Sequence, residues 1–307
     1  MHIRALIYFD ELVRSRSIRA AAEKLDIQPT ALARQIDQLE HYFGTQLVER
    51  HSRGIRLTSA GELLAARAGK TLRELDHVRQ LIDDLEGLKR GHVNIFAGGA
   101  AVANLLAPVL ADFSLRYPNI RFSVNITSAR AAVDALASAE ADMAVTLFSE
   151  SDPGARVRLR AQIVYDVIAA AGHPAAIHRE LTVAQLAGYP LAVPDRGFGA
   201  RVAFDAFFAA AGQKLDPLFV TSSLEMLREL VLRGAAVTLL PALTVSREVD
   251  SGLLVAIPIA EGRGIRTPID LIVPGERQLS FAAAKLVDAV ERFMRQSMEK
   301  APVKISV

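Results

Sequence analysis

The chain of 307 residues contains no cysteine. This absence excludes a disulfide scaffold, a cysteine-ligated zinc site and a thiol nucleophile. The chain also lacks a large excess of charge of one sign, since it has 36 Lys and Arg and 34 Asp and Glu, for a formal net charge of +2. The whole molecule is therefore no polycation, and any contact with nucleic acid must come from a local cluster of basic residues.

Long apolar runs are missing as well. The longest candidate, residues 231–245, is interrupted by Arg233, Gly234 and Pro241, so no membrane span is predicted. Charges spread over residues 1–17 argue against a secretory signal. We therefore expect a soluble, cytoplasmic protein. With 51% apolar residues the chain can bury sizeable cores, and its length suggests two or three domains.

Residues 17–36 have the pattern of two short helices joined by a tight break. An alanine-rich helix is predicted over residues 18–25, and a second begins at Pro29, whose fixed φ suits the first helical turn. Apolar spacing over residues 3–14 predicts a helix before them. This layout is typical of a helix-turn-helix, whose second helix enters a DNA major groove. The side chains of this second helix predicted to face the core are Leu32, Ile36, Leu39 and Phe43.

The opposite face of this helix carries the residues predicted to contact DNA. They are Gln28, Pro29, Thr30, Ala31, Arg34 and Gln35. The alternative for Arg34 is a solvated surface charge, and the alternative for Gln28 is a helix-capping role. Gly44 is the expected C-cap.

Two strand-like runs, residues 47–50 and 55–57, follow and are joined by a turn that contains Gly54. They predict a two-stranded wing. Basic side chains in such a wing suit minor-groove or phosphate contacts. The candidates are Arg50, Arg53 and Arg56.

A long helix is predicted from Thr58 onward, with apolar residues in heptad spacing from residue 64 to residue 85. Because this seam lies between two domains, it predicts pairing with a second copy of the chain. Packing against its own domain is the alternative. The candidate dimerisation residues are Leu64, Ala68, Leu75, Val78, Ile82 and Leu85.

From residue 92 strands alternate with helices, which is typical of a parallel sheet, and a second such α/β half begins near residues 164–170. Two halves imply a cleft, and open α/β sheets bind ligands beyond the carboxyl ends of their strands. The candidate ligand-binding residues follow strands or begin helices. They are Gly99, Ala100, Ala101, Thr127, Ser128, Phe148, Arg196, Gly197, Phe198, Ser222, Ser223 and Thr238.

Hydroxyls and backbone N–H groups at helix starts can hold a carboxylate, and Arg196 would supply a fixed positive charge. The alternatives are that Ser222 is only an N-cap and Arg196 only a surface charge. The first loop consists of Gly and Ala, which weakens the case for a strongly polar ligand.

Enzyme motifs are lacking. Residues 197–199, Gly-Phe-Gly, are too short for a phosphate loop, and no Gly-x-Ser-x-Gly elbow occurs. His173 and His178 have poor spacing for a metal. We predict no catalytic residue, no metal site and no cofactor.

The chain resembles the LysR-type transcriptional regulators over nearly its whole length. In the N-terminal part the resemblance rests on Phe9, Ser17, Ala21, Ala22, Leu25, Pro29, Thr30, Ala31, Leu32, Arg34, Gln35, Ile36, Leu39, Glu40, Gly44, Leu47, Arg50, Arg53, Gly54, Leu57, Thr58, Ala60, Gly61 and Glu62. In the second part it rests on Phe113, Tyr117, Pro118 and the segments 142–145, 186–191, 234–237 and 239–241.

The resemblance implies a mostly α winged helix-turn-helix domain over residues 1–58 and a linker and dimerisation helix over residues 59–90. An α/β effector domain of the two-subdomain, type 2 periplasmic-binding-protein-like fold is expected over residues 91–300. Its subdomain I would comprise residues 91–164 and 268–300, and its subdomain II residues 165–267.

The function implied is that of a non-enzymatic regulator. It would bind double-stranded promoter DNA as a dimer, usually a dimer of dimers, and respond to a small-molecule co-inducer. Contact with RNA polymerase is expected, and no association with a membrane is expected. One alternative is the same regulator with a vestigial, ligand-independent sensor domain. A periplasmic solute-binding protein is a further alternative, against which the helix-turn-helix argues.

Two positions depart from the family pattern. Pro29 and Ala33 stand where family members commonly carry a base-reading Gln and a Ser. Because Pro29 has no side-chain group that can bond an adenine edge, we predict that Gln28, Thr30 and Arg34 carry more of the DNA contact.

Overall fold

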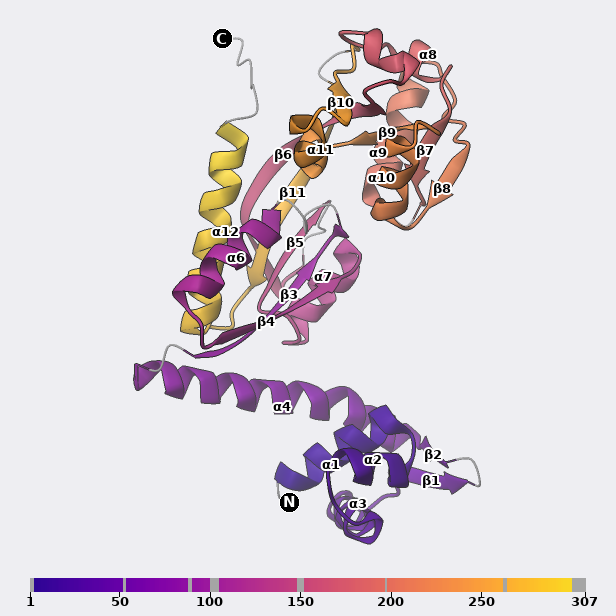
Figure 1. Ribbon diagram of the computed structural model, residues 1–307. Coiled ribbons are helices and arrows are strands. Elements are labelled where there is room, and N and C mark those ends of the chain that lie inside the picture. The colour runs from indigo at the N-terminus through magenta and orange to yellow at the C-terminus, as the bar shows by residue number, and fades with distance from the viewer. Residues whose placement is uncertain are drawn as a thin grey trace. The chain divides into compact units, whose positions relative to one another are not determined.

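The computed structural model (Figure 1) describes residues 3–51, 54–87, 90–99, 105–147, 152–196, 198–261 and 264–299. The chain divides into two compact units, residues 1–86 and residues 87–307. The long helix predicted after Thr58 belongs to the first unit. The finer domain boundaries expected from the sequence stay a prediction.

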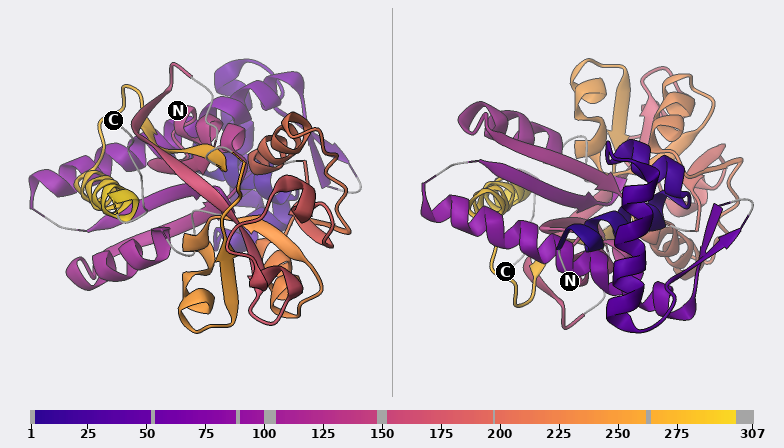
Figure 2. Two further views of the ribbon diagram at one scale, coloured as in Figure 1. Left: turned by 90° about the horizontal axis from the view of Figure 1, so that it is seen from above. Right: turned by 90° about the horizontal axis from the view of Figure 1, so that it is seen from below.

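The N-terminal unit contains three short helices, a hairpin and one long helix. These elements are α1 (Ile3–Ser15), α2 (Ile18–Lys24), α3 (Pro29–Phe43), β1 (Val48–His51), β2 (Gly54–Leu57) and α4 (Ser59–Leu85). The right panel of Figure 2 shows the hairpin projecting beside the helices of this unit. The layout confirms the predicted winged helix-turn-helix.

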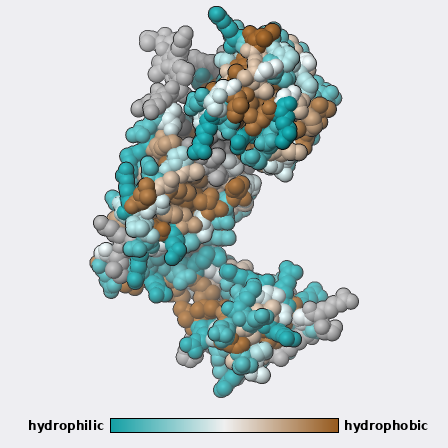
Figure 3. All heavy atoms as spheres, viewed as in Figure 1, coloured by the Kyte–Doolittle hydropathy of each residue, from teal (hydrophilic) through white to brown (hydrophobic). Residues whose placement is uncertain are grey.

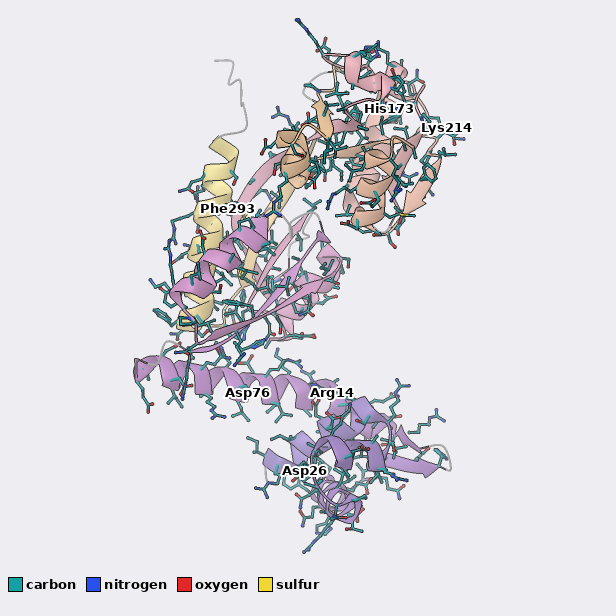
Figure 4. All side chains as sticks on the ribbon, in the orientation of Figure 1. Arg14, Asp26, Asp76, His173, Lys214 and Phe293 are labelled. Carbon is teal, nitrogen blue, oxygen red and sulfur yellow. The ribbon has the colours of Figure 1, made fainter. Side chains whose placement is uncertain are left out.

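Local signals set the ends of these helices. The Ser17 hydroxyl accepts a hydrogen bond from the N–H of Ala20, 3.4 Å away, and so caps α2. Asp26, labelled in Figure 4, takes a φ of 52° in the turn before α3, a conformation that Asp tolerates better than most residues. Gly44 ends α3 in the left-handed region with a φ of 67°.

The core of this unit is formed by apolar side chains from all three short helices and the start of α4. Leu32, Ile36 and Leu39 are buried, as predicted. The prediction for Phe43 is wrong, since 43% of this residue is exposed. Phe43 lies in the last turn of α3 and packs edge-on against the exposed Tyr42 ring, with centroids 5.0 Å apart, instead of entering the core.

The C-terminal unit is built around one sheet. Its first half contains β3 (Gly91–Ala97), α6 (Ala107–Arg116), β4 (Ile120–Ile126), α7 (Ala129–Ala137), β5 (Met143–Leu147) and β6 (Ala155–Ala170). Then follow η2 (Pro174–Ile177), α8 (Val183–Leu186), β7 (Leu191–Pro194), α9 (Gly199–Ala210), β8 (Phe219–Thr221), α10 (Leu224–Leu232) and β9 (Val237–Leu240). The chain closes with η3 (Ala242–Val245), α11 (Ser246–Asp250), β10 (Leu254–Ile257), β11 (Ile265–Pro274) and α12 (Phe281–Glu299).

The strand order is β4-β3-β5-β11-β6-β9-β7-β8, with β10 paired to β6. Parallel strands form each end of the sheet, and β6 and β11 cross the middle antiparallel to each other. Up to Tyr165, β6 pairs with β11, and from Asp166 onward it pairs with β9 and β10. Two long strands therefore join the two α/β halves, as Figure 1 shows.

The sequence predicted only the ends of these crossing strands, residues 164–170 and 269–273. The structure extends β6 back to Ala155 and β11 back to Ile265. Alternating arginines, Arg156, Arg158 and Arg160, occupy the missed part of β6 and are exposed. This alternation is itself the period-two pattern of a strand with one solvated face.

Candidate DNA-binding face and effector site

The N-terminal half of α3 presents the predicted DNA-contacting residues to solvent. Gln28, Pro29, Thr30, Ala31 and Arg34 are exposed, and Gln35 is half-buried. Gln28 occupies the N-cap position, yet its side chain makes no capping hydrogen bond. The polar atoms of this side chain are therefore not engaged in capping the helix.

The wing is fastened to α3 by a carboxylate. Glu40 Oε1 accepts hydrogen bonds from the N–H groups of Leu47 (2.8 Å) and Val48 (3.1 Å). The strands pair antiparallel, with Val48 opposite Leu57 and Glu49 opposite Arg56. These two hydrogen bonds tie the start of the wing to α3.

The structure describes the three predicted wing arginines to different extents. Arg56 is exposed on β2, and Arg50 is placed in β1 by its backbone. Arg53 lies outside the described residues. Strand β2 is also hydrogen-bonded to the segment between α1 and α2, since the N–H of Ile55 donates to the carbonyl of Arg16 at 3.1 Å.

The first turn of α4 closes against the same wing. The Thr58 hydroxyl donates to the Gln46 carbonyl at 2.7 Å and accepts from the Gly61 N–H at 3.0 Å. A Cβ on Gly61 would overlap the Leu47 carbonyl oxygen. Glycine is therefore required here because helix and strand approach backbone to backbone.

A hollow in this unit carries the wrong charge for phosphate. It is lined by Asp37, Glu40, Gln46, Val48 and Glu49. Its carboxylates would repel a DNA backbone. None of the predicted DNA-contacting residues lines this hollow.

The seam residues of α4 fall into two groups. Ala68 is buried and Leu64 half-buried against the core of the N-terminal unit. Leu75, Val78, Ile82 and Leu85 remain 42%, 48%, 51% and 88% exposed. Figure 3 shows hydrophobic atoms in brown on the surface of this unit beside hydrophilic ones. The N-terminal end of the seam therefore packs against its own unit, and the C-terminal end remains exposed in the single chain.

In the C-terminal unit, the candidates of the first half lie at the carboxyl ends of strands. Gly99 follows β3, while Thr127 and Ser128 follow β4. The Ser128 hydroxyl caps α7 by accepting from the N–H of Ala131 at 3.3 Å. The remaining candidates of this half, Ala100, Ala101 and Phe148, lie outside the described residues.

The candidates of the second half differ in exposure. Arg196 and Ser222 are exposed, and Phe198 is half-buried at the N-cap of α9. Ser223 caps α10 by accepting from the N–H of Met226 at 3.2 Å. Gly197 lies outside the described residues.

Thr238 serves the interior of the sheet. It is fully buried, and its hydroxyl donates to the Ala192 carbonyl of the neighbouring strand at 2.6 Å. A hydroxyl used in this way offers no free donor to a ligand, so the structure speaks against an effector contact through it.

The two halves of this unit meet beside the first loop. A Cβ on Gly99 would lie 3.2 Å from Leu224 Cδ1 at the start of α10 and 3.8 Å from Ile126 Cγ2 at the end of β4. Gly99 therefore borders an apolar part of the space between the halves.

Sequence reasoning missed three polar residues of the central strands. Asp270 of β11 is fully buried and accepts from Arg160 Nε at 2.7 Å and from Arg160 Nη2 at 2.9 Å. The hydrogen bond to Asp270 raises the pKa of Arg160, so the guanidinium stays charged. Thr146 of β5 is buried, and its Oγ1 has no hydrogen-bond partner. The arginine alternation in β6 was the only sequence signal for Arg160.

The two histidines weighed as metal ligands have structural roles. His173, labelled in Figure 4, accepts from the N–H of Ala175 through Nδ1 at 3.1 Å, and burial lowers its pKa. His178 Nε2 lies 3.2 Å from the Tyr189 hydroxyl. Within the described ranges, no group of three or more His, Cys, Asp or Glu could hold a metal ion. The helices in these ranges also include none that is long and apolar enough to cross a membrane.

Comparisons with known proteins agree with this geometry. Residues 3–62 match the family model of the bacterial regulatory helix-turn-helix protein, lysR family, and residues 86–295 match the LysR substrate binding domain. A RuBisCO operon transcriptional regulator from Allochromatium vinosum is 29% identical over 293 residues, covering 92% of this chain and 94% of the relative. A hydrogen peroxide-inducible genes activator from Pectobacterium carotovorum is 28% identical and covers 97% and 99% of the two chains.

Solved structures share the fold. Full-length CbnR in complex with its target DNA superposes with a TM-score of 0.71 at 22% identity, covering 95% of this chain and all of that one (100%). Full-length OxyR from Pseudomonas aeruginosa gives a TM-score of 0.65 at 20% identity over 96% of this chain and 95% of that one.

A winged helix-turn-helix joined to a two-part α/β sensor defines a class of ligand-responsive transcription regulators that are not enzymes. Within that class, this chain belongs to the LysR family of bacterial transcriptional regulators.

Proposed function

We propose that this LysR-family regulator acts in the cytoplasm, where it binds double-stranded promoter DNA through the start of α3 and the wing. In this proposal a small organic effector held by the C-terminal unit controls the bound state. The exposed residues at the start of α3, on a helix hydrogen-bonded to the wing through Glu40, carry the proposal; they are Gln28, Pro29, Thr30, Ala31 and Arg34.

The chemistry of α3 supports base contacts. An Arg can donate two hydrogen bonds to guanine, and a Gln can pair with adenine. Thr30 and Arg34 are exposed four residues apart on α3 and therefore share one face of the helix, and Gln28 is exposed at its N-cap. Pro29 adds only apolar contact, so the operator preference of this protein should differ from that of relatives with a Gln there.

A gel shift with DNA from upstream of the protein's own gene tests the DNA contact. Arg34→Ala should weaken operator binding about 10- to 100-fold, the value of one good base contact. Arg67→Ala, at an exposed arginine of α4, is the matched control and should bind like the parent chain. Affinity should fall steeply with salt. Equal losses in both variants, or unchanged binding by Arg34→Ala, would remove Arg34 from the interface.

We infer that the exposed end of the α4 seam pairs with the same helix of a second copy. Leu75, Val78, Ile82 and Leu85 repeat at intervals of three and four residues and are all exposed in the single chain. Apolar side chains at such spacing are stabilised by burial against a partner helix. Assembly of two such dimers, and contact with RNA polymerase, belong to the same proposal.

Light scattering tests the pairing. Ile82→Lys should place a charge in the seam and shift the protein toward the monomer. Leu63→Lys is the control, because Leu63 is 66% exposed on α4 but lies outside the seam. If both variants keep the parent mass, the seam does not hold the copies together.

A further inference from the structure

Four neighbouring strands bring residues to one level of the C-terminal sheet. Gly98 follows β3, and a Cβ on it would lie 4.0 Å from the Cα of Thr146. Thr146 pairs with Asp270, and Asp270 pairs in turn with Arg160. Residues directly opposite on antiparallel strands point to the same face, so these three side chains share one face of the sheet. The level is that of the carboxyl ends of β3 and β5, where open α/β sheets bind ligands.

Arg160 is oriented by Asp270 and keeps more than half of its hydrogen-bond donors unused. Asp270 takes the Nε–H and one Nη2–H, which leaves three of the five guanidinium N–H groups. The remaining Nη1 and Nη2 donors form an edge that fits a second carboxylate with two parallel hydrogen bonds. Among the described residues, Asp270 is the one acceptor that this side chain contacts, and 54% of the side chain is exposed.

The burial of Asp270 is unlike that of an ordinary surface ion pair. Its side chain is 0% exposed, whereas Arg158 on the same strand pairs with Glu291 and Asp288, which keep 16% and 44% exposure. Burying a carboxylate costs free energy, and an apolar pair would stabilise the sheet equally well. A buried Asp does, however, fix the guanidinium of its partner for recognition of another group.

Thr146 supplies a second, independent observation. Its hydroxyl oxygen is buried without a hydrogen-bond partner one strand away from Asp270. Most buried hydroxyls have a partner, so this one has unused capacity to donate to an oxygen of a ligand. Next to this level, Gly99 borders the apolar side chains of Leu224 and Ile126.

We propose that Arg160 and Thr146 bind the carboxylate of the effector, that Asp270 positions Arg160, and that the effector is a small monocarboxylate with an apolar remainder. The inference rests on the proposed function, because it assigns the chemistry of that effector. The apolar remainder lies toward Gly99, Ile126 and Leu224, while the charged group meets the free edge of Arg160.

Thermal shift and calorimetric titration of the full chain test the assignment, with butyrate and phenylacetate as probes and butyramide and phenylacetamide as neutral controls at constant ionic strength. The carboxylates should raise the Tm saturably, and the amides should not. Arg160→Lys keeps a charge beside Asp270 but loses the planar fork, so it should bind at least about tenfold more weakly. Thr146→Val should weaken binding about three- to tenfold while keeping the side-chain shape.

Arg158→Lys is the matched control, because this arginine of β6 also pairs with carboxylates, those of Asp288 and Glu291 on α12, and its replacement should leave the response intact. The proposal is overturned if neither carboxylate acts on the parent chain, if the amides act equally, or if Arg160→Lys responds as the parent does. Equal losses in Arg160→Lys and Arg158→Lys would also overturn it. Operator binding measured without ligand distinguishes failure of the proposed function from failure of this inference. A parent chain that does not bind DNA refutes the proposed function. A parent chain that binds DNA but shows no response to the carboxylates refutes only this inference.

Discussion

Replacement of Gly61 by alanine should loosen the wing from α4. The Thr58 N–H donates to the Leu47 carbonyl at 3.1 Å, and the Thr58 hydroxyl donates to Gln46, so strand and helix cannot separate without losing hydrogen bonds. A Cβ on Gly61 would overlap that same carbonyl oxygen and lie 3.0 Å from the Leu47 carbonyl carbon. The clash is with backbone on both sides, which has no alternative rotamer to adopt.

The size of the effect follows from two opposing contributions. Overpacking of a rigid contact costs about 1–3 kcal/mol, and alanine regains at most about 1 kcal/mol of helix propensity. Because the contact is with backbone, the upper part of this range, about 2–3 kcal/mol, applies, and the net free energy of unfolding should fall by roughly 1–2 kcal/mol. For a unit of 86 residues this corresponds to a decrease in Tm of roughly 4–16 °C.

Gly69→Ala provides the control on the same helix. A Cβ there would lie 3.2 Å from Arg73 Nη1 and 3.4 Å from Asp10 Oδ1, which are the ends of flexible side chains. This variant should be as stable as the parent or gain up to about 1 kcal/mol.

Thermal unfolding by circular dichroism, with hydrogen exchange of the segment 29–57 to localise the change, measures both variants. Gly61→Ala should also weaken operator binding. If Gly61→Ala is as stable as Gly69→Ala, the backbone contact does not constrain this position and the reasoning is refuted.

Three further outcomes are expected. Burial raises the pKa of Tyr165 to about 12, so one of the five tyrosines should ionise late in a spectrophotometric titration. The phenol of the unfolded chain ionises near pH 10, so the raised pKa of Tyr165 contributes its whole share of the free energy of unfolding below pH 10. That share is lost as the pH rises toward 12. Tyr165→Phe should abolish this part of the pH dependence of stability. Ser17→Ala removes the cap of α2 and should cost about 1 kcal/mol in urea unfolding, against no change for the exposed Ser222→Ala. Leu227→Ala leaves a cavity under α10 and should cost about 2–5 kcal/mol, whereas Met226→Ala at its exposed neighbour should cost little.

Local chemistry in the sequence determined the N-terminal unit and the class of protein. The hydroxyl of Ser17, the ring of Pro29 and the absent side chain of Gly44 act on the next few residues, so their effects can be deduced without knowing the fold. Heptad spacing in α4 and the alternation of strands and helices after residue 92 are equally local. The confirmed helix-turn-helix, wing and α/β halves follow from such signals.

The tertiary structure alone decided which of these residues are available for contact. Leu64 and Leu85 occupy the same seam, yet only packing on the N-terminal core separates the buried end from the exposed one. Thr238 matched the pattern of a ligand-binding hydroxyl until strand pairing placed it against Ala192.

The row formed by Thr146, Asp270 and Arg160 shows the physical reason. These residues lie on three strands, Asp270 is 110 positions from Arg160 and further still from Thr146, and no local propensity relates them. Their proximity comes from antiparallel register between β5, β11 and β6, which depends on how the whole sheet closes. Sequence therefore determined the class of protein and the elements of its fold, while sheet register and burial decided which polar groups meet.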